Sequence, residues 1–177
     1  TFFVRANDDQ IETWDWPLGS TLTAKVYVTG VETGVPDYID TTTVDGPAAW
    51  DPRNYATFDL AEHFDLQPAH LVTVSDGITT KSTVISPLAF TSLDLESDLV
   101  HGVALPGFRV DLWACDNAGC WNRHQMPSGA GEWTADFAHP GVEDDEQNTV
   151  DLRGDVWVDS VQNDDDGDGT MFGKYIS

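Results

Sequence analysis

The sequence predicts an all-β protein made of two tandem immunoglobulin-like antiparallel β-sandwiches. Three observations support this prediction: apolar and polar residues alternate in short runs, turn-forming residues interrupt these runs about every ten residues, and the second half of the chain repeats features of the first. Helical periodicity is almost absent. The 177 residues are 40% hydrophobic, which is enough to bury a core in one large domain or two small ones.

Several segments alternate as half-buried strands do, with every second side chain apolar. Residues 21–28, 70–75 and 108–115 show the pattern most clearly, with apolar positions at Leu22, Ala24, Val26 and Val28, at Val72 and Val74, and at Val110 and Leu112. Clusters of Gly, Pro, Asn and Asp separate these segments. Turns at such intervals are typical of a β-sandwich.

An internal repeat divides the chain into two domains. Aligning residues 11–26 with residues 99–114 pairs Ile11 with Leu99, Gly19 with Gly107, Leu22 with Val110 and Ala24 with Leu112, and further along Trp50 pairs with Trp133. We therefore expect one sandwich over residues 1–86 and a second over residues 87–177. The short apolar segment 85–90 is the expected linker.

The two cysteines, Cys115 and Cys120, flank the turn-forming tetrapeptide Asp-Asn-Ala-Gly. This spacing places them across the mouth of a hairpin, and a disulfide is the favoured interpretation. A zinc site would need two more ligands, and only His124 lies close in sequence. A disulfide would indicate an oxidising, extracytoplasmic compartment.

Charge narrows the classes of partner. The chain has 31 Asp and Glu against 8 Lys and Arg, a formal net charge of −23, which repels nucleic acid and anionic membrane surfaces. No apolar run is long enough to insert in a bilayer. Because the chain opens as though already within a strand, we read it as a mature or excised piece of a longer protein.

The residues resemble a known family. The segments 65–81 (DLQPAHLVTVSDGITTK) and 131–141 (GEWTADFAHPG), with the WPLGSTLT and DDDGDGT stretches, are similar to tandem immunoglobulin-like repeats of large secreted or surface proteins of Chloroflexi-type bacteria. The resemblance covers nearly the whole chain. It implies an extracellular β-sandwich array whose partners are neighbouring domains or further copies, and it implies no reaction or catalytic residue.

Residues 163–170 (NDDDGDGT) raise a question of charge, because four carboxylates lie within eight residues. Carboxylates about 5 Å apart repel by roughly 1 to 3 kcal/mol per pair, and the nearest basic residue in the sequence is Lys174. Asp164, Asp166, Asp168 and Gly169 match the first half of a calcium loop, D-x-D-x-D-G. We therefore expect bound Ca²⁺, with a solvated acidic turn as the alternative.

The calcium motif is incomplete. The bidentate Glu of an EF-hand is replaced by Tyr175, and no flanking helices are expected. The remaining oxygens would come from Thr170, Asn163, water or the acidic segment 141–148. A second acidic cluster, formed by Asp94, Glu96 and Asp98, is read as a solvated turn that matches residues 7–10 of the first copy.

Tryptophan suggests a second class of function, because exposed indoles stack on sugars. Trp14, Trp16 and Trp121 are the candidates for carbohydrate binding, although packing in a core is favoured for Trp14 and Trp16. No catalytic motif is present, and the five His show no metal-ligand spacing. The sequence thus indicates a non-enzymatic, extracellular, calcium-binding stalk, spacer or adhesive module, and the alternative is a polysaccharide-binding module.

Overall fold

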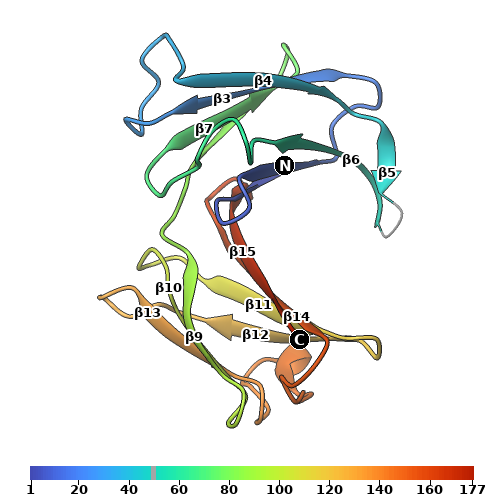
Figure 1. Cartoon of the computed structure of the whole chain (residues 1–177), viewed down its shortest axis with the longest axis vertical. Helices are drawn as coiled ribbons and strands as arrows, with labels where there is room; N and C mark the ends of the chain where they lie inside the picture. Colours follow the sequence, from blue (N-terminus) through green and yellow to red (C-terminus); the bar gives the residue numbers. More distant parts are fainter. Residues whose placement is uncertain (49–50) are drawn as a thin grey trace. The chain divides into compact units, whose positions relative to one another are not determined.

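The computed structural model describes residues 1–48 and 51–177 (Figure 1). Within them the regular structure consists of fifteen strands and one short 3-10 helix, which confirms the all-β prediction. The chain divides into two compact units. Unit 1 comprises Thr1–Ser86 together with Asp164–Thr170, and unit 2 comprises Pro87–Asn163 together with Met171–Ser177.

Unit 1 contains the first eight strands, arranged as two layers (Figure 1). They are β1 (Phe2–Arg5), β2 (Gln10–Trp14), β3 (Thr21–Tyr27), β4 (Tyr38–Thr43), β5 (Gly46–Ala48), β6 (Asp51–Asp59), β7 (Leu71–Ser75) and β8 (Thr80–Val84). One layer has the order β1-β2-β6-β5 and the other β4-β3-β7-β8. The pairings β1–β2, β2–β6, β3–β4, β3–β7 and β7–β8 are antiparallel.

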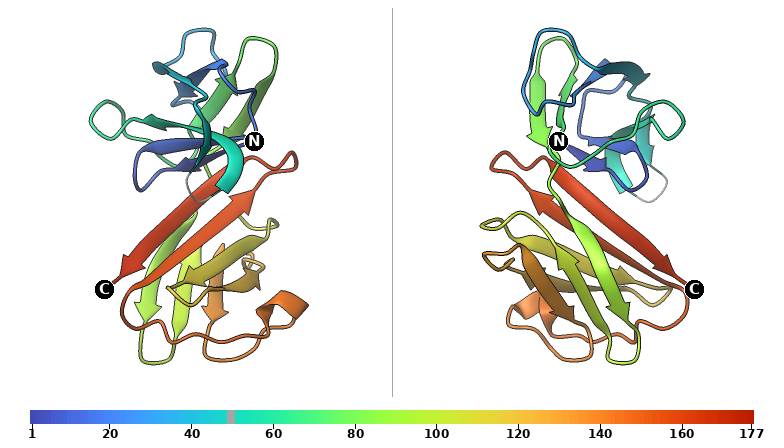
Figure 2. Two further views of the ribbon diagram at one scale, coloured as in Figure 1. Left: turned by 90° about the vertical axis from the view of Figure 1, so that its right-hand side faces the viewer. Right: turned by 60° about the vertical axis from the view of Figure 1, so that its left-hand side comes forward.

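Unit 2 has the same plan as unit 1, and Figure 2 gives two further views of its strands. Its elements are β9 (Ala89–Asp94), β10 (Leu99–Val103), β11 (Val110–Cys115), β12 (Cys120–Gln125), β13 (Glu132–Asp136), the 3-10 helix η1 (Asp144–Glu146), β14 (Val156–Asn163) and β15 (Gly169–Ile176). The layers have the orders β9-β10-β13 and β12-β11-β14-β15. Apart from β5, each strand of unit 1 therefore has a counterpart in unit 2.

Equivalent aspartates show how closely the two units repeat each other. Asp9 and Asp98 precede β2 and β10, and both take positive φ, at 51° and 54°. The Asp9 carboxylate accepts the backbone N–H of Leu66 at 2.8 Å, and the Asp98 carboxylate accepts that of Leu152 at 2.9 Å. The aligned Gly19 and Gly107 also share positive φ. Trp50, aligned with Trp133 in the sequence, lies outside the described residues.

Each unit has its own hydrophobic core between its two layers. The first core includes Phe2, Leu22, Phe58 and Val72, and the second includes Val100, Leu112, Phe137 and Val158. Alternating burial along β11 matches its sequence pattern, as expected for a strand with one face in a core. In the expected linker, Ile85 belongs to the first core and Leu88 to the second.

The acidic loop belongs to a different unit from the one expected. The sequence assigned it to the second domain, but Asp164–Thr170 groups with unit 1, while the flanking residues of β14 and β15 belong to unit 2. The physical reason is that Asp168 is completely buried among residues of unit 1, contacting Thr1, Phe2 and Lys81.

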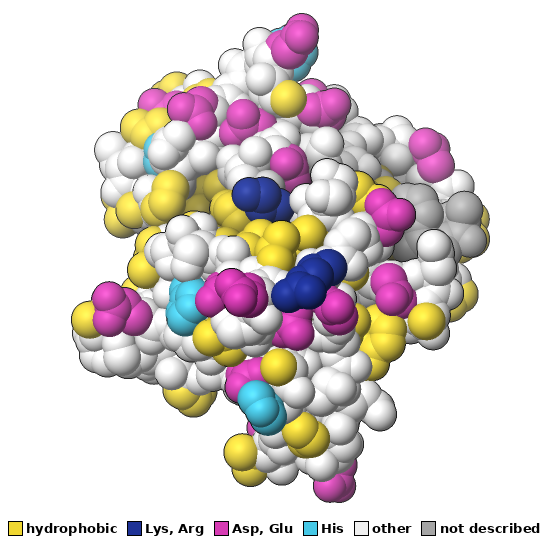
Figure 3. Space-filling model, turned by 60° about the horizontal axis from the view of Figure 1, so that its bottom comes forward, with side chains coloured by type: hydrophobic (Ala, Val, Ile, Leu, Met, Phe, Trp, Pro, Cys, Tyr) yellow, Lys and Arg dark blue, Asp and Glu magenta, His cyan; other side chains and the backbone are white. Residues whose placement is uncertain are grey.

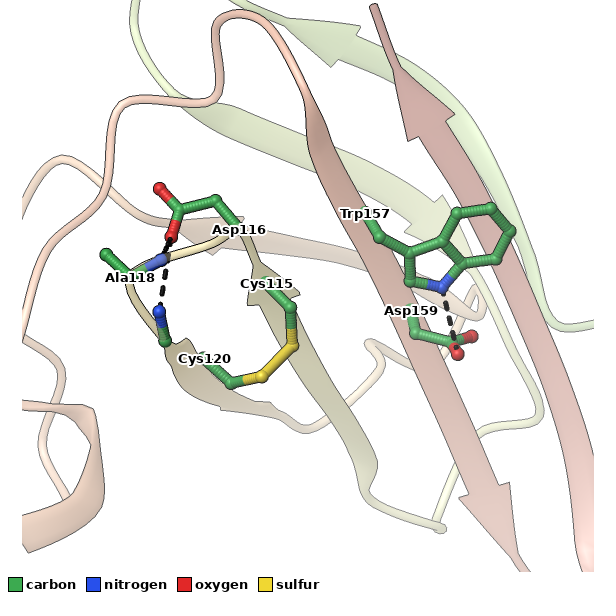
Figure 4. The surroundings of a disulfide bond; sticks show 7 residues. Cys115, Asp116, Ala118, Cys120, Trp157 and Asp159 are labelled. Carbon is green, nitrogen blue, oxygen red and sulfur yellow. Dashed lines mark hydrogen bonds between the residues drawn. A yellow bond between two sulfur atoms is a disulfide. The ribbon is translucent and has the colours of Figure 1, made fainter. Parts of the chain in front are cut away.

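The expected disulfide is present between Cys115 and Cys120, which are register partners on β11 and β12 (Figure 4). The turn between them is closed by Asp116, whose carboxylate accepts the backbone N–H groups of Ala118 and Gly119. The two cysteines are separated by 5 positions in the sequence, so the disulfide closes only a small loop.

We therefore expect the double variant Cys115→Ser, Cys120→Ser to lose only about 2 kcal/mol, the chain-entropy contribution of so short a loop. Urea denaturation of the oxidised protein and of the variant measures the difference. Intact mass should rise by two hydrogens on reduction. Free thiols in the untreated protein, or a variant that fails to fold, would contradict this account.

Candidate metal centre

The acidic loop is a closed turn organised by Asp164. The backbone N–H of Asp164 donates to the carbonyl of Asp168 at 2.8 Å. The Asp164 carboxylate Oδ1 accepts the backbone N–H of Asp168 at 3.1 Å and that of Asp166 at 3.3 Å. Gly167 supplies the positive φ, 80°, that the turn needs. The three alternate aspartates of the calcium motif therefore stand on one short, internally bonded loop.

Asp168 anchors this loop to unit 1. Its side chain is fully buried, and Oδ1 accepts the backbone N–H of Phe2 and the hydroxyl of Thr1, each at 2.8 Å. Lys81 Nζ contacts the other oxygen, Oδ2, at 3.0 Å. A buried carboxylate needs partners of this kind, because removing its charge from water is otherwise costly.

Lys81 on β8 supplies the counter-charge that the sequence did not reveal. Its Nζ lies 3.3 Å from Asp166 Oδ2 and also contacts the Asp166 carbonyl at 3.3 Å. Partial burial lowers the pKa of Lys81, but the hydrogen bonds and charges of Asp168 and Asp166 outweigh burial and raise its pKa. The expectation that the loop lacks a basic neighbour was therefore wrong, because only basic residues close to the loop along the sequence had been considered.

Asp164 and Asp166 form a close carboxyl pair. Burial, and then a side-chain hydrogen bond donated by protonated Asp164 to Asp166, raise the pKa of Asp164, whereas accepting this hydrogen bond and the contact with Lys81 lower the pKa of Asp166. Two carboxyl groups at hydrogen-bond distance favour sharing a proton or a cation. Lys81 therefore neutralises the loop only in part.

The other residues expected to complete a calcium shell are used differently. The hydroxyl of Thr170 accepts the backbone N–H of Ser86 at 2.8 Å. Asn163 Oδ1 is buried and has no hydrogen-bond partner among the described residues. In the segment 141–148, Glu143 and Asp145 face His124 on β12.

The second acidic cluster is a turn, in agreement with the favoured interpretation. Asp94 Oδ1 accepts the backbone N–H groups of Glu96 at 3.0 Å and Ser97 at 3.3 Å. The Asp98 carboxylate accepts the backbone N–H of Leu152, as described above. These carboxylates thus support the backbone of a strand connection.

The three candidate sugar-binding indoles are largely inside the protein, in agreement with the core packing that was favoured for Trp14 and Trp16. Trp14 and Trp16 are 7% and 5% exposed, and Trp121 packs partly buried against the second core. Trp14 lies against Tyr55 and Arg53, which cover its ring. Trp157 on β14, whose apolar sequence context suggested burial in a core rather than sugar binding, is 38% exposed and donates from Nε1 to Asp159 (Figure 4).

One cluster escaped the sequence analysis. Among the described residues, His124, Glu143 and Asp145 form a group whose potential metal-ligating atoms all lie within 4.8 Å of one another. About twenty residues separate the histidine from the two acids, so no ligand spacing is visible in the sequence. The fold brings them together by packing η1 against β12.

The acidic residues do not gather in one patch on the face drawn in Figure 3, where they are scattered among uncharged side chains. This distribution is that of a solvated acidic surface. In the described part of the chain no helix is long and apolar enough to span a membrane.

No family model matches the chain, and no curated protein matches it. One similar solved structure is the tetra-tandem repeat in the extending region of a large adhesion protein, at 14% identity and a TM-score of 0.34, covering 100% of this chain and 47% of that one. Another is part of a 1.5-MDa bacterial ice-binding adhesin, at 15% identity and a TM-score of 0.27, covering 99% of this chain and 59% of that one. Such low TM-scores do not establish a shared fold.

Proposed function

We propose that this chain is a non-enzymatic, extracellular structural module of a larger surface protein, built from two immunoglobulin-like β-sandwiches and stabilised by Ca²⁺ at the acidic loop. The observation that carries the proposal is the repeated strand order of the two units, β1-β2-β6 with β4-β3-β7-β8 and β9-β10-β13 with β12-β11-β14-β15. Successive copies of one sandwich are typical of stalk, spacer and adhesive segments.

The chemistry of the chain supports an extracellular setting. A disulfide such as Cys115–Cys120 persists in oxidising compartments. The resemblance of the sequence to tandem repeats of bacterial surface proteins points the same way, and it suggests neighbouring domains or further copies as partners. A net charge of −23 keeps such a protein soluble and surrounds it with cations.

Calcium is proposed because Lys81 balances only part of the loop's charge. Asp164 and Asp166 remain paired with each other, and Asp166 is exposed, so a divalent ion can reach them from solvent. Hard carboxylate and carbonyl oxygens at alternate positions suit Ca²⁺. Bound calcium would compete with Lys81 for Asp166, while Asp168 keeps its contacts to Thr1 and Phe2.

Thermal melts in EDTA and in millimolar calcium test this proposal. An ion that binds only the folded state stabilises by about 2.7 kcal/mol when present at about 100 times Kd. We expect calcium to raise the melting temperature of the wild type and to leave that of Asp166→Asn unchanged. Asp165→Asn is the matched control, since it removes an exposed neighbouring charge outside the alternating motif and should keep the calcium response.

Lys81→Met separates the two sources of counter-charge. In EDTA it should lower stability by about 1 to 2 kcal/mol, because buried Asp168 loses its charged partner but keeps two donors. Its calcium response should exceed that of the wild type, since the competing ammonium is gone. Identical wild-type melting temperatures in EDTA and calcium would contradict the proposal and leave Lys81 as the resident counter-ion.

A further inference from the structure

The side chain of His124 is aimed at two carboxylates on unit 2. Its Nε2 lies 3.0 Å from Asp145 Oδ2 and 3.8 Å from Glu143 Oε2. Ligands bound tetrahedrally at about 2.0 to 2.1 Å from one ion are about 3.3 Å apart. The observed separations are close to this value. Glu143 and Asp145 are about half exposed, so small rotations can complete the geometry.

A neighbouring carboxylate holds the imidazole in place from its other side. His124 Nδ1 lies 2.7 Å from Asp111 Oδ1, and the two residues are direct partners across β11 and β12. A hydrogen bond from Nδ1–H to a carboxylate fixes the ring and leaves the Nε2 lone pair for a metal, as in many zinc sites. Arg109 in turn contacts Asp111, with Nε 2.7 Å from Oδ1.

The loop that carries Glu143 and Asp145 is bonded to β12, the strand of His124. Glu146, only 3% exposed, accepts the backbone N–H of His124 at 2.6 Å and the N–H groups of Val142 and Glu143 at 2.8 Å each. One carboxylate therefore links the histidine backbone directly to the acidic loop. A site whose ligands are held in this way before binding loses little conformational entropy when the ion arrives.

We propose that His124, Glu143 and Asp145 bind a divalent transition-metal ion, with Zn²⁺ as the best match, and that Asp111 is its positioning residue. One imidazole nitrogen and two carboxylates suit Zn²⁺ better than Ca²⁺, which takes oxygen ligands throughout. Three carboxylates, Asp111, Glu143 and Asp145, surround this imidazole, and one guanidinium group, Arg109, contacts Asp111 and Glu143, so the local charge favours a cation.

Solvent has access to the proposed site. A surface pocket of about 320 Å³ is lined by His124, Glu143 and Glu146, together with His139 and residues 140–142. The pocket gives solvent access to two of the three proposed ligands, His124 and Glu143, and a water molecule there would be the fourth ligand. The site lies entirely within unit 2 and is independent of the calcium loop, which groups with unit 1.

Isothermal titration of the full chain with ZnCl₂, near neutral pH and at physiological salt, tests the proposal. We expect one equivalent to bind the wild type. His124→Gln and Asp145→Asn should weaken binding more than 10-fold, and Asp111→Asn, which leaves all three ligands in place, about 10- to 100-fold. His63→Gln, at an exposed histidine of unit 1, is the matched control and should bind as the wild type does.

Two further measurements keep the test independent of folding. Glu143→Gln alters a half-exposed side chain and should weaken zinc binding with an unchanged melting temperature in EDTA. Co²⁺ should give visible absorption bands in the wild type and lose them in His124→Gln. Equal zinc affinity in the wild type and His124→Gln, or displacement of zinc by equimolar Ca²⁺, would overturn the proposal and leave the cluster as an ion pair that fastens the loop.

Discussion

Replacing Arg123 with methionine should destabilise unit 2 by about 4 kcal/mol, the largest loss we expect from a single substitution. The guanidinium is 1% exposed and donates to four backbone carbonyls, those of Asn122, Asp136, His139 and Asn148. Methionine fills a similar volume but donates nothing. Each charged hydrogen bond contributes about 1.5 to 3 kcal/mol, and partial relaxation of the loop reduces the sum.

Urea denaturation and thermal melting measure this loss. For a unit of this size we expect the melting temperature to fall by roughly 20 °C. Arg153→Met is the matched control, because Arg153 also donates to backbone carbonyls of its unit, at Leu95 and Glu96, but is 60% exposed. Water can replace those bonds, so the control should lose less than about 1 kcal/mol. Equal losses in both variants would refute this role for Arg123.

The Gly102→Ala variant should lose about 3 kcal/mol by overpacking the second core. Gly102 on β10 is the register partner of Trp133 on β13, and the indole lies directly over its Cα. An added Cβ would overlap the Trp133 ring and come within 2.6 Å of the carbonyl oxygen of Ala89. Trp133 is buried, so the ring or a whole strand must shift.

Gly129→Ala provides the comparison for this prediction. No heavy atom lies within 4 Å of the position that a Cβ would take at Gly129, and the φ of Gly129 is not in the left-handed region. Stability should therefore change by less than about 0.5 kcal/mol. If Gly102→Ala were tolerated as well as Gly129→Ala, Trp133 would not pack on the glycine as the structure shows.

Local pattern was enough to predict the strands. Alternation of Leu22, Ala24 and Val26 places one face of β3 in a core, and the same spacing in Val110 and Leu112 does so for β11. The turn between Cys115 and Cys120 predicted their pairing, because a hairpin brings its two ends together whatever the rest of the fold does. These inferences depend on neighbours within a few residues.

The acidic loop shows where this reasoning ends. The alternation of Asp164, Asp166 and Asp168 is visible in the sequence, but the residue that neutralises them is not. Lys81 is separated from Asp166 by 85 residues and from Asp168 by 87. Nothing in the local pattern marks Lys81 among the 8 basic residues, because its role follows from the place of β8 in unit 1.

The sequence by itself determined the β-strands, their turns, the repeat and the disulfide, since each depends on the periodicity of the backbone or on residues close along the chain. Only the tertiary structure decided that Trp14 and Trp16 are buried, that the acidic loop groups with unit 1, and that His124 meets Glu143 and Asp145. These features depend on contacts between distant segments, and their geometry is set by how whole strands pair and pack. One sequence carries no local signal for such pairings.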